Sequence, residues 1–369
     1  MIPADRGWVI RAEEAEDRES LLALERESPE QGALGVRLDL HFSHAELARR
    51  FPAVEGYVAV PAGGACARAS VAGVVFCSLA PTQWRGAVVP AAYLFSLRVH
   101  PEWRRRGVAS ALIEHAWSRA VASGAALAWA LVAGGNKASL PTFVRAGFTS
   151  LGDGRLRLVL PSLAVPPLPR RPGGHYPPGT GAWHMRRAEQ RDLPALALAL
   201  NDTHARHNLW RPCNAGELAA QLAVPGHGPA HVLLALNGDD IAAAGAVLHT
   251  GRIARLRLLP PMSLPPLVQR IAAPLLARVP FQPRVLRHRL LPAIAHGGRD
   301  GQGAGQRLLT ALAGSLSCWA SPLLVSIDPY DPAWQLIRRV RGTSTRLHVI
   351  ARLAGGALPQ RGDRPLYLG

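Results

Sequence analysis

A short stretch near residue 100 constrains the fold more than any other part of the sequence. The apolar run Tyr93–Val99 is typical of a buried strand, and Pro101 ends it because proline cannot donate a ladder hydrogen bond. The basic turn Arg104–Gly107 comes next, and an apolar-periodic run through Leu112 and Trp117 then predicts a helix. The sequence therefore predicts a strand and a helix joined by a cationic turn.

This turn has the features of an anion-binding cradle. Backbone N–H groups at a helix start carry partial positive charge, and the small residues Gly107 and Ala109 let a phosphate approach them. No Walker pattern occurs in the chain, and no dinucleotide-binding glycine pattern occurs at this turn. The alternative interpretation is an ordinary turn with a solvated basic run.

The pattern R-x-x-G-x-A, which follows a V-x-P strand end, resembles motif A of the GNAT superfamily of N-acetyltransferases. In that family the turn holds the pyrophosphate of acetyl-CoA. The segment Asn136–Phe148 resembles motif B, N-x-x-[AS]-x-x-x-[YF]-x-x-x-G-[FY], at each anchor position. One predicted helix and one predicted strand, Leu127–Val132, separate the two motifs, as in the family.

The resemblance implies a GNAT fold for residues 1–160 and acetyl-CoA as co-substrate. The acetyl-CoA-binding residues that it implies are Leu97, Val99, Arg104, Arg105, Arg106, Gly107, Val108, Ala109, Ser110, Asn136, Ser139 and Phe143.

An internal repeat indicates a second domain. Trp183–Arg186 matches Trp8–Arg11, and the same register also pairs acidic and apolar positions of the following helices. Those pairs are Glu14 with Glu189, Asp17 with Asp192 and Leu21 with Leu196. Residues 161–182 are rich in proline and glycine and predict a semi-rigid linker. We therefore expect an α/β chain of two tandem GNAT domains, residues 1–160 and 183–369, each with a mixed, mostly antiparallel sheet flanked by helices.

The second domain shows a weaker form of the cradle. The run Gly301–Gly305 is glycine-rich and enters a predicted helix, but Asp300 stands where the first copy has Arg104. A carboxylate repels a pyrophosphate, so the pattern predicts a degenerate second site. Residues 25–50 are expected to hold a helix, and the chain from Gly355 is expected to be a tail. His204 and His207 have helical spacing without a third ligand nearby, which favours a solvated helix over a metal site.

Charge and cysteine content bound the function. The formal net charge is +17, carried almost wholly by arginine, and the single lysine is Lys137. Such a charge favours acidic partners including nucleic acid, although no motif supports that reading. The four cysteines lack C-x-x-C spacing, which argues against a zinc or disulfide framework. No secretory signal or membrane span is indicated. We expect a cytoplasmic protein, with a nuclear location as the alternative in a eukaryote.

The whole chain also resembles the plant HOOKLESS-type tandem acetyltransferase-like proteins. The resemblance is carried by Leu24–Ser28, Tyr93–Val99, Asn136–Phe148 and Phe281–Arg287. It implies an acetyltransferase-like chain whose acceptor is not specified.

GNAT catalysis is direct transfer. A base deprotonates the acceptor ammonium, the amine attacks the thioester, and a backbone N–H near Leu97 polarises the carbonyl. The family's frequent strand carboxylate falls at Phe95 or Ser96, and its frequent tyrosine acid falls at Phe143. Neither Phe95 nor Ser96 can act as a base, and Phe143 has no proton to give as an acid. A thiolate is a tolerable leaving group, since thiols have pKa values of about 8.5.

The remaining base candidates are Glu27, Asp39 and His41, in the segment that borders the acceptor site in this superfamily. The expected activity is acetyl transfer to a primary amine of a small molecule or a protein. The alternatives are a catalytically weak acyl-CoA-binding regulatory protein and a nucleic-acid-associated acetyltransferase.

Overall fold

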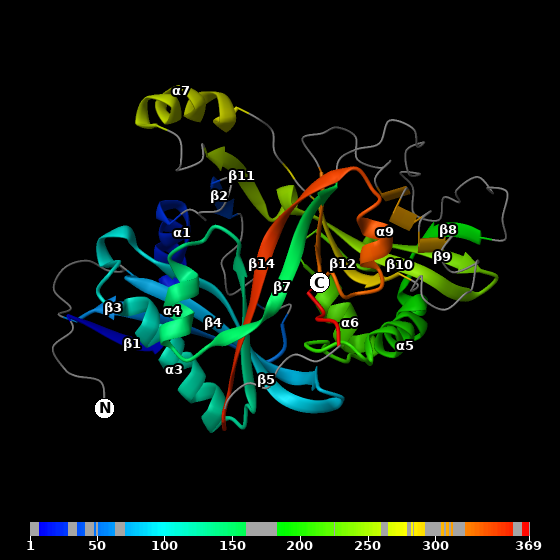
Figure 1. Ribbon diagram of the computed structural model, residues 1–369, viewed down its shortest axis with the longest axis horizontal. Helices are drawn as coiled ribbons and strands as arrows, with labels where there is room; N and C mark the ends of the chain where they lie inside the picture. The colour runs from blue at the N-terminus through cyan, green and yellow to red at the C-terminus, as the bar shows by residue number, and fades with distance from the viewer. Residues whose placement is uncertain are drawn as a thin grey trace.

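The computed structural model describes residues 7–28, 35–40, 48, 51–62, 71–159, 183–224, 226–259, 265–278, 282, 284–291, 304–305, 308–309, 311–312, 322–356 and 364–368 (Figure 1). The strands are β1 (Trp8–Ala12), β2 (Gly35–Leu40), β3 (Val54–Pro61), β4 (Gly73–Trp84), β5 (Ala87–Val99), β6 (Leu127–Ala133), β7 (Thr149–Val159), β8 (Trp183–Arg187), β9 (Val232–Asn237), β10 (Asp240–His249), β11 (Ala254–Leu259), β12 (Arg284–Leu290), β13 (Leu323–Ile327) and β14 (Gly342–Leu353). The helices are α1 (Arg18–Glu27), α3 (Val108–Ala122), α4 (Ser139–Arg145), α5 (Leu193–His204), α6 (Ala215–Leu222), α7 (Pro266–Ala277) and α9 (Trp334–Ile337).

One continuous sheet runs through the described part of the chain. It has 12 strands in the order β1-β3-β4-β5-β6-β14-β7-β13-β12-β10-β9-β8. Neighbouring strands in it are antiparallel except for two parallel pairs, β5 with β6 and β12 with β13. The predicted mixed, mostly antiparallel sheet flanked by helices is confirmed.

The centre of this sheet is made by strands from different halves of the sequence. β14 lies between β6 and β7, with Leu347 opposite Ala133 and Leu353 opposite Leu127. β7 in turn pairs with β13 on its other side. Figure 1 shows β14 and β7 side by side in the middle of the molecule. The C-terminal strand therefore completes the sheet of the N-terminal elements, while β7 extends the sheet of the C-terminal ones.

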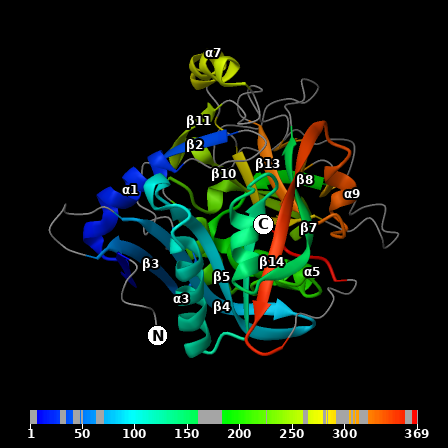
Figure 2. The ribbon, with the colours of Figure 1, turned by 60° about the vertical axis from the view of Figure 1, so that its left-hand side comes forward.

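Helices cover both faces of the N-terminal strands. Leu94 of β5 packs with Leu112 and Ile113 of α3, in a core that also holds Phe148. On the opposite face, Phe76 of β4 packs with α1. We call this second face the α1 face. Figure 2 shows α3 lying across β4 and β5, whereas α7 stands apart near β11.

The repeated sequence positions make the same contacts in both halves. Arg11 binds Asp17 with N–O distances of 2.6 and 2.7 Å, and Arg186 binds Asp192 with the same two distances. Each aspartate also accepts the backbone N–H of the residue three positions before it, Glu14 or Glu189. The repeat in the sequence thus corresponds to a repeat in local structure.

Two expectations about elements are wrong. Residues 35–40 form β2, because Val36, Leu38 and Leu40 alternate with polar residues at the strand period and β11 supplies a partner strand. The chain end is not a free tail either. Leu366 is fully buried, and its N–H donates to Asp328 Oδ2 at 2.5 Å. Within the described ranges, no helix is long and apolar enough to cross a membrane.

Candidate functional site

A β-bulge interrupts β5 where the basic turn approaches. Val74 of β4 lies opposite Arg98 and Phe76 lies opposite Phe95, so Ser96 and Leu97 together face a single residue of β4. Ser96 has a φ of 52°, in the left-handed region that non-glycine residues rarely adopt. Bulges bend a strand and redirect its edge. After this bulge, the end of β5 still pairs with β4 but no longer pairs with β6.

The parallel pairing of β5 with β6 ends just before the bulge. The paired residues are 91–93 and 127–129, and Tyr93 opposite Trp129 is the last pair. We call the region beyond this pair the first splay, and the pair itself its apex. Along the described part of β5 beyond the apex, β6 provides no ladder partner. Backbone groups on that edge are therefore available to a bound molecule.

The basic turn lies at the open end of the first splay. Arg104 Nε donates to the carbonyl of Val99 at 3.2 Å, which holds the turn against the end of β5. Arg105 and Gly107 both have positive φ, 62° and 82°, and Gly107 is the N-cap of α3. Space is open where a Cβ of Gly107 would stand. The first N–H groups of a helix lack intrahelical partners, and those of α3 follow directly after the cationic turn. The start of α3 therefore offers charge and space to an anion.

The side chains of this turn and of the start of α3 differ in exposure. Arg104, Arg105 and Arg106 are exposed, and the Arg106 guanidinium lies 5.1 Å from the ring centroid of Trp103. Val108 is buried in the core beneath, whereas Ala109 and Ser110 are partly exposed in the first turn of α3.

The predicted motif B residues have structural roles. Asn136 Oδ1 accepts the backbone N–H of Ser139 at 3.1 Å, which caps the start of α4. Phe143 is buried and packs edge to face on Phe148, with centroids 5.1 Å apart. These residues fix α4 on the face that carries α3.

Of the three base candidates, Glu27 alone has a described side chain. Its Oε2 lies 2.6 Å from His100 Nε2, and His100 follows directly after β5. Ser28 Oγ donates to the Val99 carbonyl at 3.1 Å, so the end of α1 is fastened to the end of β5. Asp39 lies on β2, and His41 lies outside the described residues. The Glu27–His100 pair is a carboxylate and an imidazole within proton-transfer distance, at the open end of the splay.

Aromatic rings surround the apex on the α1 face. The rings of Tyr93 and Trp129 stack with centroids 4.2 Å apart, and Phe51 and Phe95 lie against Tyr93 at 5.7 and 5.3 Å. Arg211 reaches this cluster from the segment after α5. Its Cζ lies 5.7 to 6.0 Å from the centroids of Phe51, Tyr93 and Trp129.

Arg211 is held by one residue of β4. Its terminal nitrogens donate to Ser78 Oγ at 3.1 Å and to the Ser78 carbonyl at 3.2 Å, and its Nε is shielded and unpaired. Burial lowers the pKa of Arg211 to about 10. No carboxylate among the described residues binds it. Removing an ion from water costs several kcal/mol, whereas each ring contact returns about 0.5–2 kcal/mol. Sequence patterns did not reveal this residue, because its ring partners are far away along the chain.

The C-terminal strands repeat the bulge and the splay. Ala244 of β10 lies opposite Leu290 and Ala246 lies opposite Arg287, so His288 and Arg289 face one residue. His288 has a φ of 46°, as Ser96 has 52°. The parallel pairing of β12 with β13 covers only Arg284–Val285 and Leu323–Leu324. We call the region beyond these pairs the second splay.

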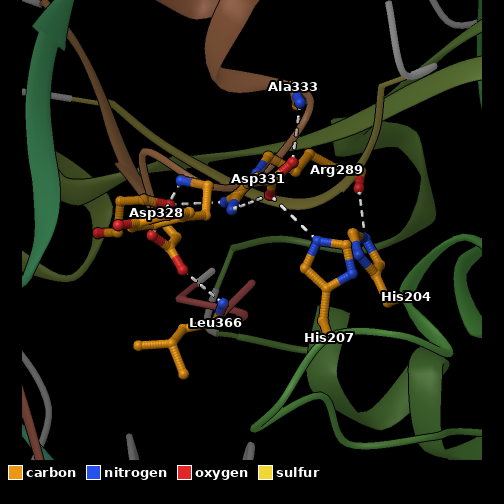
Figure 3. A network of polar contacts seen from close by, with 9 residues as sticks. His204, His207, Arg289, Asp328, Asp331, Ala333 and Leu366 are labelled. Atoms are coloured by element: carbon orange, nitrogen blue, oxygen red, sulfur yellow. Dashed lines mark hydrogen bonds and ion pairs between the residues drawn. The ribbon is translucent and has the colours of Figure 1, made fainter. Parts of the chain in front are cut away.

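A buried arginine spans the second splay (Figure 3). Arg289, at the bulge position that Leu97 occupies in β5, is 1% exposed, and it donates to the Ser326 carbonyl of β13 at 2.7 Å. Asp331 Oδ2 lies 3.4 Å from Arg289 and 3.4 Å from His207 Nε2. His204 Nε2 lies 2.9 Å from the Arg289 carbonyl. Side chains thus occupy the place that is left without a ladder partner in the first splay.

The histidine pair is therefore not on a solvated helix. His204 and His207 are both buried, because the tertiary structure places them beside Arg289 and Asp331. Across the part of the chain that the structure describes, no group of His, Cys, Asp or Glu side chains is arranged to hold a metal ion. The proposed second cradle at Gly301–Gly305 cannot be compared, since residues 292–303 lie outside the described ranges.

The region that contains the first splay matches a known protein family. Residues 20–148 match the Acetyltransferase (GNAT) family. The chain therefore contains a GNAT acetyltransferase domain, and the protein is an acyltransferase. The expectation of an enzyme of this class is confirmed. No curated protein matches the chain.

Solved structures resemble most of the chain in fold. Saccharomyces cerevisiae N-myristoyltransferase with bound myristoyl-CoA is 11% identical, with a TM-score of 0.62 over 95% of this chain and 80% of that one. The same yeast enzyme with myristoyl-CoA and inhibitors is 11% identical, with a TM-score of 0.61 over 100% and 88%. An Enterococcus faecalis protein described as a probable N-acyltransferase is 11% identical, with a TM-score of 0.48 over 94% and 72%. At such identities the two yeast structures support the fold alone.

Proposed function

We propose that the protein transfers an acetyl group from acetyl-CoA to a primary amine, with the donor bound in the first splay. The observation that carries this proposal is the open edge of β5 leading to the basic turn at the start of α3. The strand edge suits the amide groups of pantetheine, and the turn suits the pyrophosphate. The proposed binding residues are the bulge residue Leu97, Val99 at the end of β5, the turn 104–107 and the first turn of α3.

The chemistry follows from this placement. The amine nitrogen attacks the thioester carbonyl, whose oxygen is polarised by a backbone N–H near the bulge, and the C–S bond then breaks. The Glu27–His100 pair takes the proton from the acceptor ammonium, directly or through water. Solvent protonates the departing thiolate, since Phe143 has no proton to give. The rings of Tyr93 and Trp129 at the apex favour a short acyl group.

We further propose that the chain arose by tandem duplication and that the second half binds no acyl-CoA. The repeated Arg–Asp contacts and the repeated bulges support the duplication. Arg289 in the second splay supports the loss of the second site. The domain limits 1–160 and 183–369, and the narrower HOOKLESS-type relationship, stay predictions.

The first experiment is calorimetric titration of acetyl-CoA into the intact chain, together with thiol release over a panel of amines. One site with amine-dependent thiol release is expected. Binding without release on any amine would favour the regulatory alternative, and two equal sites would contradict the loss of the second site. Salt-dependent binding of nucleic acid would favour the third alternative.

The double variant Arg104→Glu/Arg106→Glu tests the cradle. Reversing two charges beside a pyrophosphate should weaken acetyl-CoA binding by about 10- to 100-fold. Arg270→Glu/Arg278→Glu, with the same change of charge on exposed positions at α7, is the matched control and should bind as the unaltered protein does. Equal affinity in both double variants would remove the turn from the site.

A further inference from the structure

We propose that Arg211 binds a carboxylate of the acceptor, so that the acceptor is an amine that also carries a carboxylate group. This inference rests on the acyl transfer proposed above and narrows its substrate class. The buried arginines in the described part of the chain differ in their partners. Arg98 is paired with the buried Glu25, and Arg289 is paired with the buried Asp331. Arg157 binds three neutral groups, the Ser344 hydroxyl and the carbonyls of Arg338 and Val340. Among the described residues, the hydrogen-bond partners of Arg211 are the hydroxyl and carbonyl of Ser78 alone.

Most of the N–H donors of Arg211 have no acceptor among the described residues. A guanidinium carries five N–H donors, and the contacts with Ser78 account for two of them. Ser78 offers no charge to the guanidinium, and its hydroxyl already donates to the Pro52 carbonyl at 2.6 Å while it accepts from Arg211. Among the described residues, the guanidinium charge then lies against the faces of three rings. A carboxylate would pair with this cation as Glu25 and Asp331 pair with theirs.

The position of Arg211 fits the acceptor rather than the donor. The guanidinium lies against Tyr93 and Trp129, at the apex, whereas the basic turn lies at the opposite, open end of the splay. It is also on the α1 face, away from α3, whose first turn would hold the pyrophosphate. An anion at Arg211 is thus separate from the phosphates of the donor.

The strand geometry sets the size of the acceptor. Tyr93 and the bulge residue Leu97 are four positions apart, and a strand rises about 3.3 Å per residue. A carboxylate at the apex and an amine beside the bulge are therefore separated by on the order of 10 Å. The aromatic rings between these points would pack along an apolar spacer. The site consequently favours amino acids whose amine and carboxylate are several bonds apart.

The test uses ω-amino acids from glycine to 8-aminooctanoate, each compared with its primary amide. Initial rates of thiol release from acetyl-CoA give kcat and KM for each acceptor. We expect at least one of the longer acids to exceed its amide by 10-fold or more in kcat/KM. Arg211→Gln should abolish this preference, mainly through KM, whereas Arg211→Lys should keep part of it. Arg206→Gln, an exposed arginine on the same segment, is the matched control and should leave the preference unchanged.

The outcomes separate this inference from the proposed function. An amide preference in the unaltered protein, or the same acid preference in Arg211→Gln, would overturn the inference while leaving acetyl transfer intact. The comparison of acid with amide in the unaltered protein requires no folded variant. If no amine releases thiol, the proposed transfer fails, and calorimetric binding of the same acids and amides in the presence of CoA then decides the role of Arg211. Binding of acid and amide with equal affinity, or of neither, would overturn it.

Discussion

The two splays have the same backbone and different contents. Each combines a bulge at a residue of positive φ with a parallel strand pair that ends after two or three residues. In the first splay the bulge presents Leu97, and β6 provides no ladder partner for the described residues of β5 beyond the apex. In the second splay the corresponding position is Arg289, whose guanidinium crosses to β13 and joins a buried network. The same bulge and splay therefore accommodate an unpaired strand edge in one half and a buried polar network in the other.

The polar groups around the two splays differ in the same sense. Glu27 and His100 are accessible at the open end of the first splay, with side chains 55% and 25% exposed. His207 and Asp331 are 6% and 4% exposed in the second. An accessible acid–base pair can exchange protons with a substrate, whereas a buried pair serves only the fold. This difference in exposure favours the first splay as the place of the proposed chemistry.

The largest expected effect comes from breaking the second network. Asp331→Ala leaves Arg289 and His207 buried without their carboxylate, so we expect a loss of about 3–5 kcal/mol in the free energy of unfolding. Urea unfolding of the variant and the unaltered protein measures it. Asp153→Ala is the matched control, because Asp153 also lies between a histidine and an arginine, His348 and Arg346, but nearer the surface. It should cost less than about 1 kcal/mol. Equal losses would contradict the contrast between the splays.

Much of the first splay could be predicted from the sequence, because it depends on local patterns. The strand before Pro101, the glycine that begins α3 and the motif B anchors are each read within a few residues of one another. The contacts of Arg11 with Asp17 and of Arg186 with Asp192 repeat because the repeat lies in the sequence itself.

The remainder depends on distant pairs that no local pattern encodes. β2 is a strand because β11, more than 200 positions later, supplies its partner, and β14 lies beside β6 although the two belong to different halves of the chain. Arg211 and Arg289 look like two more arginines in an arginine-rich sequence. Their importance follows from burial, which depends on tertiary packing.

The next effect comes from making the first splay resemble the second. Leu97→Arg places a guanidinium where Arg289 stands in the other half, but without the facing carboxylate of Asp331. The side chain should occupy the free edge of β5 and weaken acetyl-CoA binding by about 30-fold or more, a change of about 2 kcal/mol. Calorimetric titration measures this change. Leu97→Met, which keeps an apolar side chain of similar volume, is the control. Unchanged affinity in Leu97→Arg would place the donor elsewhere.

The smallest effect concerns pH and tests whether the buried His204 of the second splay stays neutral. Burial lowers the pKa of His204 to about 3, while an unfolded histidine titrates near ~6.5. The unfolded chain therefore binds more protons below ~6.5, so the stability from neutral His204 is complete above that pH and is lost as the pH falls toward the folded value. Each pH unit below ~6.5 should cost about 1.4 kcal/mol at this residue.

Urea unfolding at several pH values between 7.5 and 5.5 gives the free energy of unfolding as a function of pH. Its slope against pH should be shallower for His204→Gln than for the unaltered protein. Burial also lowers the pKa of His231 and His249, so the difference between the two slopes is the measure. Identical slopes would mean that His204 takes up its proton in the folded network, and the second splay would then be less tightly closed than Arg289 and Asp331 imply.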